Sequence, residues 1–187
     1  MSEAIDAAFQ SGRNGMDKAI QHLKDELLKI RTGKASPQML SGIMVEYYGN
    51  PTPLTQTANV STPDARTIAI QPWEKSLLSA IEQAIFAANL GLTPMNDGEF
   101  VRITIPPLTE ERRKGLVKMA RALAEDTKVS IRNERHKILN VIKQEVKDGF
   151  PEDQGKRRES KVQELIDSYA ETITKLIEAK EKDIMTV

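Results

Sequence analysis

The sequence of 187 residues contains no cysteine, a single tryptophan and only 4% aromatic residues. Without cysteine the chain can form no disulfide, thiol nucleophile or cysteine-based zinc site, in agreement with a reducing compartment. Few aromatic side chains favour helical rods over a deep globular core. The sequence also lacks an apolar leader and any run of membrane-spanning length. We therefore expect a soluble, cytoplasmic protein with no membrane partner.

Residues suited to catalysis are equally scarce. The two histidines, His22 and His136, lie among polar helical residues, with no second metal ligand or Ser–His–Asp arrangement in view. Gly33-Lys34 does not belong to a phosphate-binding loop, because the Gly-x-x-x-x-Gly-Lys-Ser/Thr spacing is absent. The sequence therefore predicts no enzyme, no metal site and no cofactor.

Neither sign of charge is in excess, because 27 basic residues balance 27 acids. A protein that coats nucleic acid indiscriminately is normally basic. Any RNA binding by this chain must therefore come from a local patch.

The longest predicted element covers residues 109–149, which we interpret as one helix. Thr109 suits the N-cap position, and Gly149 followed by Pro151 is typical of a helix end. At 1.5 Å per residue this helix is about 58 Å long, too long for the core of a round domain. One face is apolar and requires partner helices. This seam consists of Leu116, Ala120, Leu123, Thr127, Ile131, Ile138, Val141 and Ile142.

The same helix carries a row of cations that we call the basic stripe: Arg121, Lys128, Arg132 and Arg135. Their spacing places them on one side of the helix, with Glu125 in the same row. Composition alone favours the simpler interpretation, a solvated charged face. The alternative is shape-specific phosphate recognition, since the stripe is otherwise nearly free of carboxylates.

Two further helices are predicted. Residues 3–31 have apolar positions at steps of three, four and seven, although Gly12 and Gly15 should weaken the first half. After Gly149 the chain turns, and Pro151 suits the first position of a helix whose apolar seam extends to Ile184. Three long helices with one apolar face each predict a three-helix bundle.

Residues 32–105 follow a different pattern, with many prolines and short alternating segments. Asn96-Asp97-Gly98 is a hairpin signal, and Trp73 is predicted to be a packing anchor before a helix. Short strands are predicted at 43–48, 59–61, 67–71 and 100–105, with a helix at 76–89. The predicted fold class is therefore α+β: a bundle of residues 1–31 and 106–187 with an inserted small β/α/β domain of residues 32–105.

Two connections, residues 31–36 and 105–108, are predicted to act as hinges between these domains. The first contains glycine and small residues, whereas two prolines stiffen the second, so most rotation is expected in the first. The predicted hinge residues are Arg31, Thr32, Gly33, Lys34, Ala35, Ser36, Ile105, Pro106 and Pro107.

Several motifs resemble those of the bacterial ribosome recycling factor family. They are KIRTGKASP at 29–37, VEYYG at 45–49, PTPL at 51–54, PPLTEERRK at 106–114 and IRN-x-R at 131–135. The resemblance covers essentially the whole chain, and motifs of this length in this order are highly specific. It implies an L-shaped protein with a three-helix bundle and an inserted β/α/β domain.

The resemblance also implies a function. Together with elongation factor G and GTP, such a factor splits the ribosome after translation termination, and the bundle lies on rRNA of the large subunit. By the same resemblance, Arg132 and Arg135 would be the principal rRNA contacts, with Arg31 beside the first hinge. Lys128 and Arg121 of the basic stripe are the other candidate rRNA-binding residues. No small-molecule substrate is implied, and a monomer is expected. The motif departs from the family at His136, where another arginine is frequent, and Glu134 lies inside it.

Two alternatives from other classes remain at this point. One is a chaperone-like helical rod or protein-interaction module, which would have to leave its apolar seam partly exposed. The other is an enzyme of the inserted domain, which would require a phosphate or metal ligand there.

Overall fold

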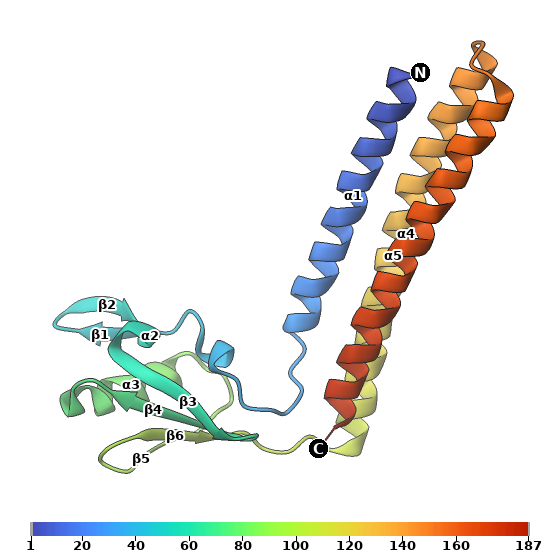
Figure 1. Cartoon of the computed structure of the whole chain (residues 1–187). Helices are drawn as coiled ribbons and strands as arrows, with labels where there is room; N and C mark the ends of the chain where they lie inside the picture. The colour runs from blue at the N-terminus through green and yellow to red at the C-terminus, as the bar shows by residue number, and fades with distance from the viewer. Residues whose placement is uncertain (1, 187) are drawn as a thin grey trace. The chain divides into compact units, whose positions relative to one another are not determined.

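The computed structural model describes residues 2–186, and the chain divides into two compact units. Met1–Arg31 and Glu110–Val187 form the first unit, which we call the bundle, and Thr32–Thr109 form the second, which we call the small unit. The bundle is helical, whereas the small unit holds all the strands of the described residues (Figure 1). The predicted α+β class, with long helices and a small sheet-containing part, is confirmed.

The bundle consists of three long helices: α1 (Glu3–Leu28), α4 (Glu110–Lys147) and α5 (Glu152–Met185). They run side by side, with α1 and α5 both packed on α4 (Figure 1). Helix α1 ends three residues earlier than predicted. The amides of Lys29 and Ile30 donate to the carbonyls of Glu26 and Leu27, only three residues back, so the last turn tightens and the α-helix stops.

The turn between α4 and α5 has the predicted glycine-based helix end. Gly149 has φ +112, its amide donates to Val146, and the Phe150 amide donates back to Glu145 at 2.8 Å. This pair of bonds is a Schellman motif. Pro151 occupies the N-cap of α5 rather than its first helical position. Its carbonyl accepts the hydrogen bond of Gly155, which starts the helix one residue later than predicted.

The seam of each helix supplies the core of the bundle. Tyr169 on α5 is half-buried, and its hydroxyl donates to the carboxylate of Asp17 on α1. Burial and this hydrogen bond raise the pKa of Tyr169 to about 12. The buried core residues include Ile5, Met16, Ile20, Leu23, Leu27, Leu116, Ala120, Ile131, Ile138, Ile142, Val162, Ile173 and Ile184.

Two glycines in the helices, Gly12 and Gly155, mark places where helices approach closely. A Cβ atom added to Gly12 would lie 2.5 Å from Cδ1 of Ile138, and one added to Gly155 would lie 2.6 Å from Cγ2 of Val146. The prediction that Gly12 and Gly15 weaken α1 misses this role. Helix α1 is continuous through both positions, because packing on α4 outweighs the low helix propensity of glycine.

The small unit contains two antiparallel sheets. Strands β1 (Met44–Tyr47) and β2 (Asn50–Pro53) form a hairpin. The other sheet has the order β3-β4-β6-β5, with β3 (Ala58–Asp64), β4 (Thr67–Pro72), β5 (Pro94–Asn96) and β6 (Val101–Thr104). Helices α2 (Leu54–Thr57) and α3 (Leu78–Ala87) and two 3₁₀ turns, η1 (Pro37–Leu40) and η2 (Lys75–Leu77), complete the unit. Side chains from both sheets and from α3 make one core.

Two of the predicted local features have different outcomes. The hairpin at Asn96-Asp97-Gly98 is present, and the Asp97 carboxylate accepts hydrogen bonds from the amides of Phe100 and Glu99 and from Arg102. These bonds lower the pKa of Asp97 to about 2. Trp73, in contrast, is 69% exposed and is not a packing anchor.

The helix glycines allow a matched test of the packing argument. Gly115 of α4 has open space where its Cβ would be, so Gly115→Ala should stabilise the bundle by about 0.8–1 kcal/mol through helix propensity. Gly12→Ala must displace the fully buried Ile138, and overpacking should leave a net loss of about 1–2 kcal/mol. The measurement is urea unfolding followed by helical circular dichroism. The urea midpoint of the small unit, followed by the fluorescence of Trp73, should be the same in the wild type and in both variants.

Equal gains for both alanine variants would show that α1 and α4 have room to spare at Gly12. The proposed role of this glycine in close packing would then be wrong.

Candidate nucleic-acid interface

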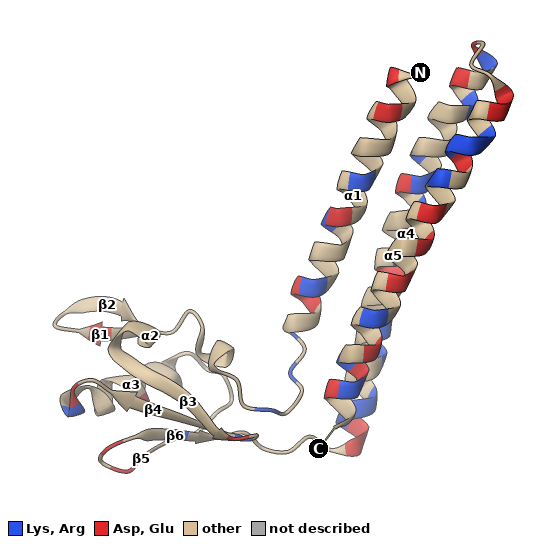
Figure 2. Cartoon of the chain, viewed as in Figure 1, with Lys and Arg blue, Asp and Glu red and all other residues tan. Residues whose placement is uncertain are grey.

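The basic stripe lies along α4, as its spacing predicts. Lys and Arg residues recur along the bundle helices among acids, whereas the small unit carries few charges of either sign (Figure 2). The structure divides the four cations of the stripe into two pairs with different surroundings.

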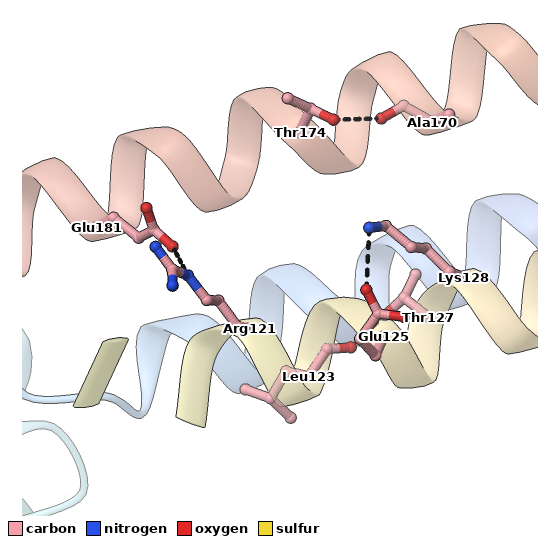
Figure 3. Close-up of polar contacts among 8 residues, drawn as sticks. All are labelled: Arg121, Leu123, Glu125, Thr127, Lys128, Ala170, Thr174 and Glu181. Carbon is pink, nitrogen blue, oxygen red and sulfur yellow. Dashed lines mark hydrogen bonds and ion pairs between the residues drawn. The ribbon is translucent and has the colours of Figure 1, made fainter. Parts of the chain in front are cut away.

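Arg121 and Lys128 form ion pairs within the bundle (Figure 3). Nε of Arg121 donates to Oε1 of Glu181 on α5 at 2.5 Å, and this hydrogen bond raises the pKa of Arg121. Nζ of Lys128 lies 3.1 Å from Oε1 of Glu125. The expectation of a stripe nearly free of carboxylates is therefore wrong for Arg121, because α5 supplies Glu181, an acid that α4 itself does not show. The partner of Lys128 is Glu125, the one acid that the prediction already placed in this row.

Arg132 and Arg135 differ from the other two cations. Within residues 2–186 neither side chain forms an ion pair with a carboxylate. Arg132 is exposed, whereas Arg135 is half-buried, with less of its side chain in water than its place on a surface stripe predicts. Their guanidinium groups are the cations of the stripe that remain available to an anion from outside the chain.

Glu134 does not neutralise the arginines beside it in the sequence. Its carboxylate pairs with Lys137 at 3.2 Å and lies against Gly15 of α1, where an added Cβ would be 2.6 Å from its Cδ. Helical geometry turns residue 134 about 160° away from residue 132. Gly15 therefore gives Glu134 a place on the α1 side of α4, away from the stripe.

A groove between α4 and α5 continues the line of the stripe toward the helix turn. It has a volume of about 670 Å³, and Arg135 forms part of its wall. The other lining residues are His136, Leu139, Asn140 and Lys143 of α4 and Lys156, Glu159, Ser160 and Gln163 of α5.

The contribution of α5 to this groove is absent from the sequence prediction. The available signal is the run Lys156-Arg157-Arg158, which follows the turn at Gly149 closely enough to fold back beside α4. The sequence of this run does not show which of its three cations lines the groove. Arg158 pairs with Asp6 of α1 at 2.6 Å, whereas Lys156 lines the groove.

The backbone amides of two predicted hinge residues, Ala35 and Ile105, are hydrogen-bonded within the small unit. The amide of Ala35 donates to the carbonyl of Ala65, and the amide of Ile105 donates to that of Arg66, each at 2.7 Å. Both connections are thus fastened to the single turn between β3 and β4. Ile105 is also buried in the core of the small unit. Arg31 is exposed, Thr32, Lys34 and Ser36 are half-buried, and Pro106 and Pro107 are exposed.

Gly33 brings the two connections together within the small unit. It has φ +76, and an added Cβ would lie 2.8 Å from Cγ of Leu108. A larger side chain would therefore be strained in its backbone and would collide with the second connection. Asp64 stabilises the nearby turn by accepting from the amide of Arg66 and the hydroxyl of Thr67, and these bonds lower its pKa.

Among residues 2–186 no group of three or more His, Asp or Glu side chains is placed to hold a metal ion. No helix in that range is both long and apolar enough to cross a membrane.

These features define a class of protein: a long helical bundle with a cationic face, into which a small α+β unit is inserted. Comparison with known families makes the class specific. Residues 23–185 match the family model described as ribosome recycling factor, and the chain belongs to this family. Its members are translation factors whose function is ribosome recycling.

Relatives of known sequence match almost end to end. The ribosome-recycling factor of Christiangramia forsetii is 54% identical over 185 residues, which is 99% of this chain and all of that one. The ribosome-recycling factor of Porphyromonas gingivalis is 53% identical, with 92% of this chain and 93% of that one covered.

Solved structures agree over the full length. A solution structure of the ribosome recycling factor has a TM-score of 0.78 and 39% identity, with both chains fully covered. The second comprises models for the T. thermophilus ribosome recycling factor and the E. coli elongation factor G bound to the E. coli post-termination complex. It has a TM-score of 0.63 and 41% identity, again with both chains fully covered.

Proposed function

We propose that this protein, with elongation factor G and GTP, splits the post-termination ribosome into subunits and frees it from mRNA. The observation that carries the proposal is the full-length similarity to the T. thermophilus factor, which is placed with elongation factor G on a post-termination complex. The direct test is light scattering of model post-termination ribosomes. Scattering should fall when the protein, elongation factor G and GTP are added together, and should stay constant when any one is left out.

The bundle is the part that we assign to rRNA of the large subunit. Arg132 and Arg135 are the principal contacts in this proposal, because no internal carboxylate has to be displaced before they meet phosphate. Arg121 and Lys128 would have to leave Glu181 and Glu125 first, so we rank them as secondary. Arg31, exposed after the end of α1, is a further contact.

We assign movement to the connections between the two units. Since the amides of Ala35 and Ile105 are hydrogen-bonded within the small unit, we assign the hinge to residues 31–34 and 106–109, which lie between these bonds and the bundle. Elongation factor G would rotate the small unit about these residues while the bundle stays on rRNA.

In this proposal the protein performs no covalent chemistry, needs no cofactor or small-molecule substrate and acts in the cytoplasm as a monomer. GTP hydrolysis belongs to elongation factor G. The alternative of a helical rod that binds other proteins requires an exposed apolar seam, but the seam residues of α1, α4 and α5 are buried or half-buried in the bundle.

The assignment of Arg132 and Arg135 predicts a specific salt dependence. The double variant Arg132→Ala/Arg135→Ala should bind large subunits more weakly. Its log K against log [salt] slope should be shallower by about 1.4–1.8, since each phosphate contact contributes about 0.7–0.9. Binding is measured by sedimentation across a salt series. Lys175→Ala is the control, because Lys175 is exposed, pairs with Glu171 at 3.0 Å and lies outside the stripe.

Wild-type affinity and slope in the double arginine variant would exclude these residues as rRNA contacts. A large loss in the Lys175→Ala control would show that binding follows net charge rather than position.

The hinge assignment predicts that binding and splitting separate at Gly33. Gly33→Val should leave large-subunit affinity unchanged but slow splitting, because the valine meets Leu108 and restricts both connections. Gly42→Val is the matched control, since Gly42 also has a positive φ (+81) but has no neighbour within 4 Å of an added Cβ. Splitting rates are measured by stopped-flow light scattering, and Trp73 fluorescence verifies that the small unit is folded.

Equal slowing in both glycine variants would attribute the effect to backbone strain in the small unit. Parallel loss of binding and splitting in Gly33→Val would assign Gly33 to folding instead of movement.

A further inference from the structure

We propose that the α4–α5 groove is a second RNA-backbone site, in which Lys143 and Lys156 contact phosphates beyond those met by Arg132 and Arg135. This inference rests on the proposed function, because it extends the rRNA face of the bundle from one helix onto two. The groove lies next to the helix turn, on the same side of α4 as Arg135.

Close packing of the two helices places the groove walls. Gly155 is buried, and an added Cβ would lie 2.6 Å from Val146 and 3.8 Å from Ile142 on α4. The backbone of α5 therefore reaches the surface of α4 at this point. Lys156, the next residue, is held on the opposite wall from Lys143 by the same contact.

The charge of the groove is poorly compensated within the chain. Arg135, Lys143 and Lys156 contribute three cations to its lining, against one acid, Glu159. Among the described residues none of the three cations forms an ion pair. Several cations elsewhere in the bundle are paired, among them Arg121 with Glu181, Lys137 with Glu134 and Arg158 with Asp6. Like charges gathered along a concave surface repel one another, and a bound polyanion would relieve that repulsion.

Two of the neutral polar residues that line the groove already donate hydrogen bonds within α5, so the lysines are its main groups for binding an anion. The hydroxyl of Ser160 donates to the carbonyl of Lys156, and the amide of Gln163 donates to Asp167, so both are already engaged. Asn140 offers a further amide on the α4 wall. Lysine ammonium groups act as point charges without base readout, so the site fits the backbone and not a particular base sequence.

The length of the cationic row favours a nucleic-acid strand over a single phosphate. Arg132, Arg135 and Lys143 lie on one side of α4, and the first and last are eleven residues apart, about 16 Å along the helix axis. A strand of a nucleic-acid duplex carries one charge about every 3.4 Å, so this row spans several phosphates. Its continuity with Arg132 is the reason to assign RNA rather than an acidic protein segment.

The test compares two double variants with the same change in net charge. Lys143→Ala/Lys156→Ala removes the groove lysines. Lys137→Ala/Lys175→Ala is the control, because these lysines are also exposed, one on each helix, but lie outside the groove and pair with Glu134 and Glu171. Both variants and the wild type are titrated with large ribosomal subunits and with protein-free large-subunit rRNA over a salt series.

The groove variant should show a salt slope shallower by about 1.4–1.8 with both probes, with unchanged helical content and urea midpoint. The control should keep the wild-type slope. An unchanged slope in the groove variant overturns the inference. If Arg132→Ala/Arg135→Ala still makes the salt slope shallower in that case, Arg132 and Arg135 contact rRNA but the groove does not. Unchanged binding in both the groove and the arginine variants contradicts the rRNA assignment itself.

A third result identifies a different partner. If the groove variant is weakened on whole subunits but binds protein-free rRNA as the wild type does, the groove meets a ribosomal protein. The RNA assignment is then wrong.

Discussion

The close packing of α1 and α5 on α4 is the constraint on which the rest of the bundle depends. Each helix has only one apolar face, so none of them is stable until that face is covered. Gly12 lets α1 approach Ile138, and Gly155 lets α5 approach Val146. These contacts fix the rotation of each helix about its own axis, and the rotation decides which charged side chains meet one another and which face outward.

The electrostatics of the candidate interface follow from that packing. Arg121 lies opposite Glu181, so its charge is matched inside the molecule. Glu134 lies over Gly15 on the α1 side, so it does not neutralise the charge of Arg132. A protein with zero net charge can in this way present a cationic face, because its acids are placed elsewhere and not because they are few.

The small unit is constrained differently. It must stay folded although its two connections to the bundle start close to each other, at the turn between β3 and β4. Its core is continuous across both sheets and α3, and the two connections are hydrogen-bonded to one turn, at Ala65 and Arg66. Each connection is therefore held by the small unit until a few residues before the bundle begins. In the proposed function, this arrangement would let a short hinge move while the small unit stays folded.

The sequence by itself determined the features that depend on neighbours along the chain. Apolar periodicity defined the three long helices to within a few residues, Gly149 defined the end of α4, and Asn96-Asp97-Gly98 defined a hairpin. Long specific motifs also identified the family.

Tertiary structure decided the availability of each charge. Whether Arg121 or Arg132 is paired depends on carboxylates that are distant in sequence or turned to another helix face. Lys156 joins Arg135 only because α5 folds back on α4. The exposure of Trp73 and the role of Gly12 were decided in the same way. The physical reason is that helical periodicity records which face of a helix is apolar, but not which partner residue stands opposite each side chain.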